Sequence, residues 1–401
     1  MILFWNSYYE DKYYSMGTGY EGFKNCQHSN CFTTTHRSSL MDPDVIVHAV
    51  VFHIPQTELK DVQRLKSNRP EIRRYNQGID PLFVFFSEEP PEGSLMNAEV
   101  FKDDIFQGFF NATISYRIAS DVYRPYGAFI EKTTGKQPLN WKMPTSTQPK
   151  NRISLKTRTK DIAWVVSHCE TVNLREKYAQ KLKDLNLLNV DIFGSCGDHQ
   201  LLSRQSVNET YNEGYAQLAE EYKFYLSFEN SECQDYVTEK FFNAFRHGLL
   251  PIALGGLDAK DYEKIAPPHS FLHIKNFTSP EDLMKYLVKL SQNEELYNSY
   301  FWWKDFYDVG FFESACPLCQ ILNTKDFKSA NDYSNMYDFW HQCAPPLNHP
   351  FMANVKIFFY NAHHSFYNLF LSPSSSYWHF YIFVFSCCCL AIFSILHYLK
   401  L

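Results

Sequence analysis

The residues with the clearest chemical potential lie in the segment 222–242. A strand-like run ends there at residues 229–230, and Thr238, Glu239 and Lys240 then begin a helical pattern. A helix N-terminus presents free N–H donors and the positive end of the helix dipole, which suits a phosphate. Lys240 adds a full charge, and Glu239 can accept hydrogen bonds from sugar hydroxyls. The segment indicates a site for a phosphorylated ligand, although a capped surface helix would have the same residue types.

Other polar residues directly follow predicted buried strands. Glu88, Glu89 and Glu92 follow one such strand, and Arg175 follows another. In open parallel sheets, ligands bind just past the carboxyl ends of the strands. A carboxylate can take a proton from an attacking hydroxyl group, and cations can stabilise the charge on a departing diphosphate. These residue types therefore favour a group-transfer reaction.

Alternating strands and helices must position these side chains. Strands are predicted at 2–5, 45–53, 82–86, 162–167, 190–193, 223–228 and 250–254, and helices at 174–185, 238–246 and 279–290. This alternation is typical of parallel sheets covered by helices on both faces. We expect an α/β fold of two Rossmann-like domains that face a cleft. The predicted parts are a domain at 1–132, a linker at 133–160, a domain at 161–325 and a stalk or wrapping segment at 326–376.

Composition narrows the class of protein further. The chain has 401 residues with 45% hydrophobic and 20% charged residues, which excludes global disorder. A net charge of −6 without Lys/Arg runs argues against a nucleic-acid partner. Of the 11 cysteines, three lie together at 387–389 in an apolar tail, and the remaining even set indicates disulfides in a secretory compartment. Acceptor sequons at Asn111, Asn208 and Asn276 agree with that compartment.

An uncharged apolar run near the end of the sequence predicts a transmembrane helix at 377–399. The N-terminal apolar stretch is too short for a signal peptide. A tail anchor alone would leave the sequons and cysteines in the cytosol. We therefore expect that an N-terminal anchor is missing from this sequence; translocation without a readable signal is the alternative.

The segment 222–256 also resembles a family signature. Its core is similar to the motif F-E-N-S-x-x-x-D-Y-[IV]-T-E-K of the α1,3-fucosyltransferases, glycosyltransferase family 10. Further blocks that match in the same order lie at 2–6, 44–48, 109–127, 163–167, 297–302 and 316–319. The resemblance implies a GT-B fold, GDP-fucose as the donor substrate and inversion at the anomeric carbon. It also implies that the N-terminal domain binds the acceptor and the C-terminal domain binds the donor.

Site residues carry over from the family one position at a time. Arg175 and Lys240 are expected to face the diphosphate, while Asn230, Tyr236 and Glu239 are expected to line the nucleotide-sugar pocket. In the segment 85–90, which is similar to the family's F-S-L-E-S-P segment, the resemblance assigns Glu88 as the general base. Glu89 stands where the family usually has Ser or Asn, and Glu89 and Glu92 are the alternatives for the base.

The resemblance also addresses the cysteines and metal binding. Family members bridge Cys-x-x-Cys pairs at 316–319 back to the N-terminal region, where Cys26 and Cys31 are the matching partners of Cys316 and Cys319. The acidic triplet at 42–44 is interpreted as a loop and not as a metal site. No cofactor is required, no metal ligand is assigned, and divalent-metal stimulation stays open.

The expected activity is transfer of L-fucose from GDP-β-L-fucose to the 3-hydroxyl of a GlcNAc. Expected partners are GDP-fucose, a glycoprotein or oligosaccharide acceptor with GlcNAc, and a membrane; the expected location is the Golgi membrane with a lumenal catalytic domain. The cysteine pattern at 167–169 and 194–197 resembles enzymes that modify the innermost GlcNAc of N-glycans, but a Lewis-type acceptor stays open. The rival hypothesis is a catalytically inactive lumenal sugar-binding protein of the same fold.

Overall fold

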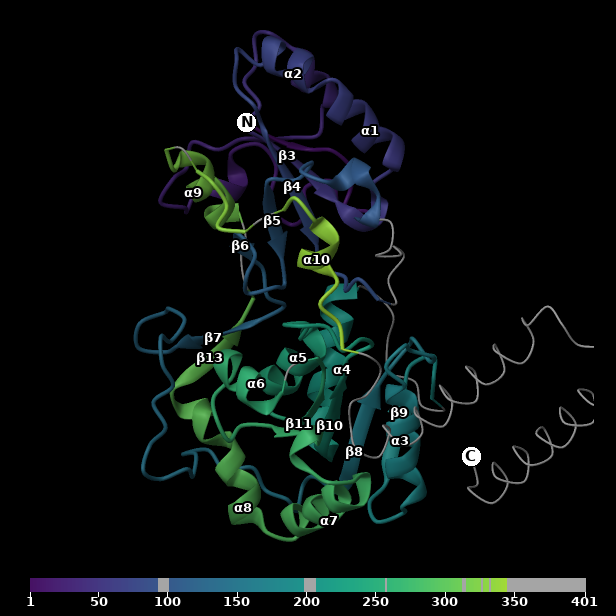
Figure 1. Ribbon diagram of the computed structural model, residues 1–401. Helices are drawn as coiled ribbons and strands as arrows, with labels where there is room; N and C mark the ends of the chain where they lie inside the picture. Colours follow the sequence, from purple (N-terminus) through teal and green to yellow (C-terminus); the bar gives the residue numbers. More distant parts are fainter. Residues whose placement is uncertain are drawn as a thin grey trace, which may run out of the picture. The chain divides into compact units, whose positions relative to one another are not determined.

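Figure 1 shows the computed structural model of the chain. The structure describes residues 1–92, 101–197, 207–256, 258–311, 315–325, 327–331 and 333–344, with the backbone alone over 207–213. Two parallel sheets dominate this part of the chain.

The first sheet is formed by six strands from the N-terminal region. The strands are β1 (Ile2–Phe4), β2 (Thr33–Thr34), β3 (Ala49–His53), β4 (Leu82–Ser87), β5 (Ala112–Ser115) and β6 (Val122–Tyr123). Their order is β2-β1-β3-β4-β5-β6, and all neighbours are parallel. The predicted strands at 2–5, 45–53 and 82–86 are confirmed, with shorter bounds at the first two.

The second sheet follows about thirty residues of chain that contain no regular element. Its strands are β8 (Lys160–Val165), β9 (Val190–Phe193), β10 (Tyr222–Phe228), β11 (Leu250–Leu254) and β12 (Leu272–His273). The order is β12-β11-β10-β8-β9, again parallel throughout. The predicted alternation of strands and helices is therefore confirmed in both regions, because parallel strands need crossover connections.

The remaining elements of the described residues are ten α-helices, six short 3₁₀ helices and one antiparallel strand pair. Between β3 and β4 lie α1 (Leu59–Ser67) and α2 (Arg69–Tyr75). The second region contains α3 (Arg175–Asp184), α4 (Val207–Glu221), α5 (Glu239–His247), α6 (Ala259–Ile265), α7 (Pro280–Ser291) and α8 (Glu294–Asn298). The last two α-helices are α9 (Ala315–Asn323) and α10 (Met336–Trp340), and the antiparallel pair is β7 (Ala128–Glu131) with β13 (Tyr307–Gly310). The predicted helix at 279–290 is confirmed as α7, and it begins with a cap: Ser279 Oγ accepts a hydrogen bond from the Asp282 N–H at 3.1 Å, with Pro280 as the first helical residue.

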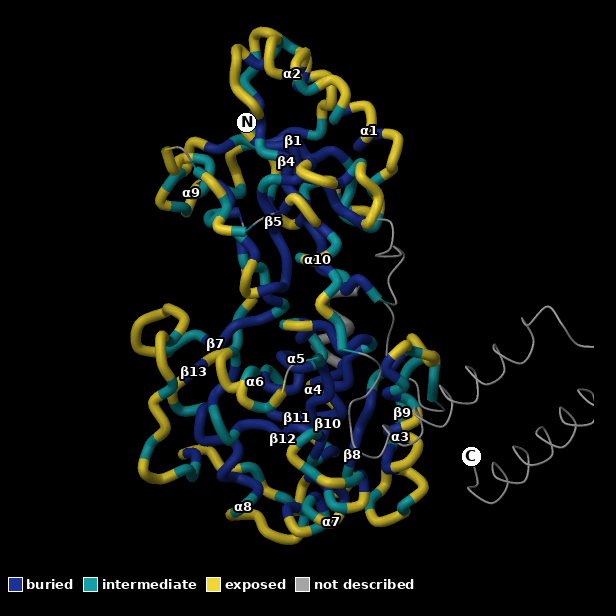
Figure 2. Tube along the Cα trace, viewed as in Figure 1, coloured by how far each residue is buried: buried dark blue, intermediate teal, exposed yellow. Residues whose placement is uncertain are grey.

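Both faces of the first sheet are covered by helices from the far end of the described chain. Alternate strand residues pack into two separate clusters, as the two-residue period of a strand requires. Trp340 of α10 joins the cluster on one face, where its ring lies 4.9 Å from that of Phe85. Leu318 of α9 joins the cluster on the other face with Phe4 and Phe86. Figure 2 shows these strands as continuous buried backbone. The N-terminal sheet therefore depends on residues beyond 315 for its core.

The predicted linker and wrapping segment are both attached to neighbouring structure. Asn298 fastens the segment 133–160 by accepting from the Ile153 N–H at 2.7 Å and donating to the Ile153 carbonyl at 2.8 Å. In the segment predicted as a stalk or wrapping region, the described residues around α10 pack into the first sheet's core.

Four disulfides cross-link the described part. Two of them join distant ends, Cys26 to Cys316 and Cys31 to Cys319, with sequence separations of 290 and 288 residues. The other two are Cys169–Cys196 and Cys233–Cys343. These bonds use all eight cysteines that lie outside the apolar tail.

The fold prediction needs correction at the membrane segment. Within the described residues, no helix combines the length and the apolar character that a bilayer crossing requires. The prediction of a transmembrane helix was therefore wrong as a part of the described fold, and the residues 377–399 to which it was assigned lie outside the described residues. A run of apolar letters shows hydrophobicity but does not by itself establish a helix.

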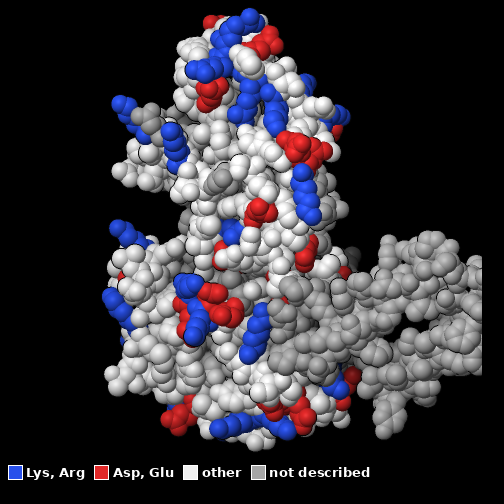
Figure 3. Space-filling view, in the orientation of Figure 1, with Lys and Arg blue, Asp and Glu red and all other residues white. Residues whose placement is uncertain are grey.

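Charge is mixed on the face shown in Figure 3, where Lys and Arg side chains lie among Asp and Glu side chains. Several surface pairs account for this pattern, among them Arg74–Glu71 at 3.3 Å and Lys285–Glu281 at 2.9 Å. Exposed pairs of this kind contribute little to stability.

Candidate active site

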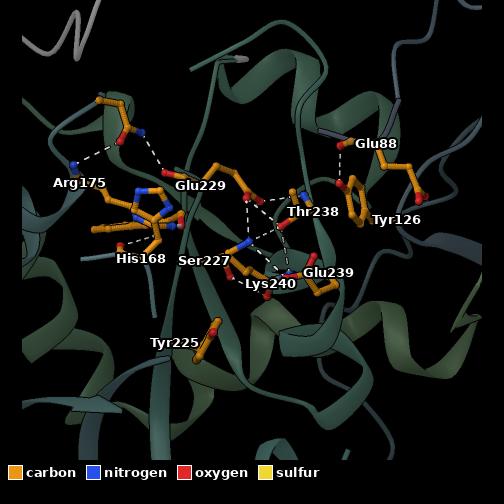
Figure 4. A network of polar contacts seen from close by, with 12 residues as sticks. Glu88, Tyr126, His168, Arg175, Tyr225, Ser227, Glu229, Thr238, Glu239 and Lys240 are labelled. Carbon is orange, nitrogen blue, oxygen red and sulfur yellow. Dashed lines mark hydrogen bonds and ion pairs between the residues drawn. The ribbon is translucent and has the colours of Figure 1, made fainter. Parts of the chain in front are cut away.

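The predicted donor residues meet at the carboxyl edge of the second sheet. Arg175 begins α3, Asn230 lies two residues after the end of β10, and Glu239 and Lys240 begin α5. The structure brings these positions together because β8 and β10 are parallel neighbours. Figure 4 shows most of this group from close by.

A buried carboxylate organises the entry to α5. Glu229 is completely buried, and its two oxygens accept hydrogen bonds from the backbone N–H (2.7 Å) and the hydroxyl (2.8 Å) of Thr238. The Thr238 side chain in turn caps the helix by accepting from the Lys240 N–H. The strand-end rule selects Glu229, which directly follows β10, but the family resemblance assigned it no role.

Lys240 is the cation at the centre of this network. Its Nζ lies 2.8 Å from Thr238 Oγ1, 3.2 Å from Glu239 Oε1 and 3.4 Å from Glu229 Oε2 (Figure 4). Burial disfavours the charged ammonium, but the two carboxylates outweigh that effect and raise the pKa of Lys240. Lys240 is therefore a fixed positive charge at a helix N-terminus, which suits a phosphate group.

Arg175 connects the ends of two neighbouring strands. Its guanidinium donates hydrogen bonds to the carbonyl of Phe228, at the end of β10, and to the carbonyl of His168 at 3.1 Å. The side chain is 2% exposed and lies over the Trp164 ring, 5.8 Å from its centroid. Burial lowers the pKa of Arg175. Both terminal nitrogens serve the backbone in this structure, so contact between Arg175 and a diphosphate stays a prediction.

Asn230 and Tyr236 occupy the loop between β10 and α5. The buried Asn230 Oδ1 has no hydrogen-bond partner within the described part of the chain. Tyr236 is buried, and its ring contacts those of Tyr116 at 4.9 Å and Tyr126 at 6.3 Å, two residues from the first sheet's region. Burial raises the pKa of Tyr236 well above its usual value, so its hydroxyl stays protonated.

Arg117 holds the same loop from the side of the first sheet. It lies two residues after β5 and donates to Gln234 Oε1 at 3.1 Å, while its Nε lies 3.9 Å from an Asp235 carboxylate oxygen. Its guanidinium also lies over the Phe339 ring at 5.0 Å. The disulfide from Cys233 to Cys343 adds a covalent connection between this loop and the segment after α10.

Removing the Cys233–Cys343 disulfide by replacing both cysteines with alanine is expected to weaken GDP binding. The bond closes a separation of 110 residues, and loss of such a cross-link costs about 2–4 kcal/mol of unfolding free energy. The matched control replaces Cys26 and Cys316, which lie in the first sheet's region. Denaturant unfolding should show a loss of stability in both variants, whereas GDP titration should show a raised Kd only for the first. An equal Kd in both variants would contradict a role for this bond in the loop.

Two acidic residues after β4 have different surroundings. Glu88 is 8% exposed, and its Oε1 accepts from Arg124 Nε at 2.8 Å. Figure 4 shows the Glu88 carboxylate pointing away from Lys240, with the Tyr126 hydroxyl donating to the Glu88 carbonyl. Glu88 is therefore already paired with a buried cation.

Glu89 is partly buried and has Tyr9 as a hydrogen-bond partner. Burial raises the pKa of the Glu89 carboxyl, and the hydrogen bond that it accepts from Tyr9 at 3.0 Å and the charge of Lys240 oppose that rise. The nearby negative charges of Glu239 and Glu88 add to the rise in the pKa of Glu89. Glu92, the third alternative, lies 3.6 Å from the His341 ring through its Oε1. Glu89 therefore differs from Glu88, which is paired with Arg124, and from Glu92, which lies beside His341.

The cysteines that could act as metal ligands are bonded in disulfides. The Cys316 and Cys319 pair, which a zinc site would need as thiolates, is used in disulfides. Among the described residues, the grouping closest to a metal site combines Glu92 with Cys233 and Cys343, and these two cysteines are bonded to each other. The acidic triplet at 42–44 forms a turn, in which the Asp44 N–H donates to Asp42 Oδ1 at 3.0 Å.

The three sequons lie in different settings. Asn276 is exposed. Asn111 is partly buried, and its side-chain oxygen accepts from the Phe83 N–H at 2.7 Å. Asn208 lies in α4 at a position whose side chain is outside the described structure. Glycosylation of these residues stays a prediction.

A cationic helix N-terminus lies at the strand ends of one parallel sheet, and carboxylates lie at the strand ends of the other. Together they form an arrangement that suits group transfer from a phosphorylated donor. Family models support this class: the fucosyltransferase N-terminal model matches residues 1–127, and the C-terminal model of glycosyltransferase family 10 (fucosyltransferase) matches residues 155–339. The chain belongs to glycosyltransferase family 10, the fucosyltransferases.

Individual relatives agree. The chain is 34% identical over 270 residues to alpha-(1,3)-fucosyltransferase C of Drosophila melanogaster, which covers 65% of this chain and 59% of that protein. It is 33% identical over 299 residues to 3-galactosyl-N-acetylglucosaminide 4-alpha-L-fucosyltransferase FUT3 of Bos taurus, covering 73% of this chain and 69% of the relative. A solved α1,3-fucosyltransferase structure aligns with 82% of this chain and 92% of its own, at 15% identity and a TM-score of 0.47. The match with the Drosophila relative thus spans less than two thirds of that protein's length.

Proposed function

We propose that this protein transfers L-fucose from GDP-β-L-fucose to the 3-hydroxyl of a GlcNAc residue, with inversion at the anomeric carbon. The observation that carries the proposal is the position of Lys240, a partly buried ammonium at the N-terminus of α5, whose charge also acts on the carboxylate of Glu89. The substrate class is supported by the names of the relatives, an alpha-(1,3)-fucosyltransferase and a 3-galactosyl-N-acetylglucosaminide 4-alpha-L-fucosyltransferase.

Lys240 and the N-terminus of α5 would bind the diphosphate of the donor. As the bond between fucose and GDP breaks, negative charge develops on the leaving phosphate. A fixed cation and helix N–H groups that are already oriented stabilise this charge without reorganising. Glu229 and Thr238 keep these groups in place through their hydrogen bonds. Asn230, Tyr236 and Glu239 are the proposed contacts with the nucleoside and sugar.

Glu89, instead of Glu88, is the base that we propose. An attack from the face opposite the leaving group needs a carboxylate that removes the proton of the acceptor hydroxyl. The carboxylate of Glu88 is held by Arg124, whereas that of Glu89 is partly buried and senses Lys240. A raised pKa brings a carboxylate closer to the operating pH and makes it a more effective proton acceptor.

Product analysis tests the proposal. The protein is incubated with GDP-fucose and an acceptor panel that contains N-acetyllactosamine and N-glycans with an exposed innermost GlcNAc. Mass spectrometry should find a gain of one deoxyhexose, and NMR should identify an α1,3 linkage; the panel also separates the core and Lewis-type acceptors. GDP binding without any turnover would instead support the inactive sugar-binding alternative. GDP-mannose serves as the donor control.

The proposed location is the lumen of the secretory pathway, in the Golgi apparatus. Four disulfides support an oxidising compartment, because they are rare in the cytosol. The two that join distant ends of the described chain would not persist in a reducing environment. Immunofluorescence of the tagged protein beside a Golgi marker tests this location, and exclusive cytosolic staining would contradict it.

A further inference from the structure

The loop after β1 exposes one aromatic ring in an unusual backbone conformation. Tyr9 is 41% exposed and has a φ of 50°. The left-handed region is unfavourable for a bulky residue, and such conformations cluster at functional sites. The neighbouring Tyr14, which also has a positive φ, is fully buried. Tyr9 is therefore the residue of this loop whose strained conformation presents a ring to the outside.

Backbone and side-chain hydrogen bonds hold the loop after β1 in a defined turn. Tyr8 and Asp11 exchange two backbone hydrogen bonds of 2.7 and 2.9 Å, which close a tight turn with Tyr9 at its tip. The Asp11 carboxylate then accepts from the Tyr13 N–H at 2.8 Å and from the N–H of Ser15. Because the turn is fixed before any ligand arrives, little entropy is lost when its tip binds one.

The ring of Tyr9 is supported from behind by other rings. The Tyr8 ring lies 5.1 Å from it and the His53 ring 5.2 Å, both edge-on. The Tyr8 ring itself packs edge-on against the ring of Phe86, the second-last residue of the buried strand β4, at 5.5 Å. The Tyr9 ring thus has aromatic neighbours on one side and is still 41% exposed, which leaves area for stacking on a ligand.

A hydrogen bond connects Tyr9 to the proposed base. The Tyr9 hydroxyl donates to Glu89 Oε1 at 3.0 Å. Glu89 belongs to the segment after β4 that contacts the donor-site loop, because the Ser231 hydroxyl after β10 donates to the Glu92 carbonyl at 2.8 Å. The Tyr9 ring therefore lies beside a segment that reaches the donor site. Its place there is not explained by packing of the core.

We propose that Tyr9 forms an acceptor subsite, in which its ring stacks on the apolar C–H face of the acceptor's pyranose ring while its hydroxyl orients Glu89. This inference rests on the proposed function and deepens it. Aromatic rings recur in ligand sites because they offer a large apolar face next to a polar group. The ligand class is a pyranoside with one flat apolar face, as in a GlcNAc-containing oligosaccharide.

Replacing Tyr9 with leucine tests the stacking contact. Leucine keeps apolar volume but removes the flat ring and the hydroxyl. The KM for N-acetyllactosamine, or for the acceptor that the panel identifies, should rise about tenfold, while the KM for GDP-fucose stays unchanged. The matched control is Tyr20→Leu, because Tyr20 is also an exposed tyrosine of the N-terminal region, with its ring 4.9 Å from Phe32. An unchanged acceptor KM, or an equal rise for both substrates, would overturn the subsite.

Replacing Tyr9 with phenylalanine isolates the hydroxyl. The hydrogen bond from Tyr9 lowers the pKa of Glu89, so its removal should raise that pKa. The base is active when deprotonated, and the acidic limb of the kcat/KM profile should therefore move to higher pH. Lys240, Glu239 and Glu88, the charges around Glu89, are unchanged in this variant. A merely structural role for Tyr9 would lower the melting temperature without moving the acidic limb.

A binding measurement separates this inference from the proposed function. Saturation-transfer NMR detects N-acetyllactosamine or the N-glycan acceptor on the protein with GDP bound, whether or not turnover occurs. If the unaltered protein binds the saccharide but transfers no fucose, the proposed function fails while the Tyr9→Leu comparison still decides the subsite. If the unaltered protein transfers fucose and Tyr9→Leu binds the saccharide equally well, only the subsite fails.

Discussion

Replacement of Lys240 by alanine is expected to lower kcat for fucosyl transfer by about 10²–10³-fold, the usual cost of removing one group that stabilises developing negative charge. Arg175, the other cation that the structure places at this edge, donates both of its terminal nitrogens to backbone carbonyls, so it is not positioned to replace the charge of Lys240. Release of GDP from GDP-fucose in the presence of acceptor gives the rate. Turnover near that of the unaltered protein would refute the assignment.

The control for this variant is Lys223→Ala. Lys223 forms a partly buried ion pair with Asp161 at 2.7 Å, near the opposite, amino end of β10. Both replacements leave a carboxylate without its cation, so both should lower the free energy of unfolding. Only Lys240→Ala should also lose transferase activity, provided that circular dichroism shows both variants folded at the assay temperature.

Replacement of Glu89 by glutamine is expected to reduce transfer by about 10²–10⁴-fold, the range that a general base contributes. Glutamine keeps the shape and can still accept the hydrogen bond from Tyr9, but it cannot take a proton. Because the base acts on the acceptor and not on the nucleotide, the Kd for GDP should stay within a few-fold of that of the unaltered protein. Isothermal titration with GDP and an acceptor assay measure the two quantities separately.

The companion variant is Glu88→Gln, whose amide oxygen can still accept from Arg124. It should cost far less activity, because Glu88 is paired with that arginine and points away from Lys240. A loss of transfer in Glu88→Gln together with a nearly normal Glu89→Gln would return the base to Glu88. The two variants thus make opposite forecasts on one assay.

The sequence predicted the two sheets well because their strands are short runs of apolar residues between polar turns. Parallel strands are buried on both faces, so a run such as 250–254 contains no polar residue and is easily identified. The pattern that begins α5 was equally clear, since Thr238 has the side chain of a helix cap.

The position of α10 could not be predicted in the same way. The surrounding sequence is aromatic and lacks a helical period, and its partners in the first sheet lie more than 200 residues earlier. Such a segment obtains its structure from tertiary contacts, and local propensity says little about it. The Cys233–Cys343 bond escaped prediction for the same reason, because cysteine pairing depends on spatial proximity.

The choice between Glu88 and Glu89 shows a different limit. Both residues follow β4, and in an extended segment neighbouring side chains point in opposite directions. The strand-end rule selects the segment but not the residue. The choice depends on Arg124, which lies 36 residues away in sequence and pairs with Glu88.

The coverage of the first sheet by α9 and α10 has a consequence for how the chain is made. Cys26 leaves the ribosome 290 residues before its partner Cys316, which at about 5–20 residues per second is a delay of roughly 15–60 s. During that interval the emerging N-terminal strands lack the helices that bury them. Cys26 and Cys31 can then pair incorrectly with Cys169 and Cys196, because these two cysteines emerge before Cys316 and Cys319. The amino-terminal half therefore completes its core only after the residues from 315 onward have been synthesised, and its yield should depend on a catalyst of thiol–disulfide exchange.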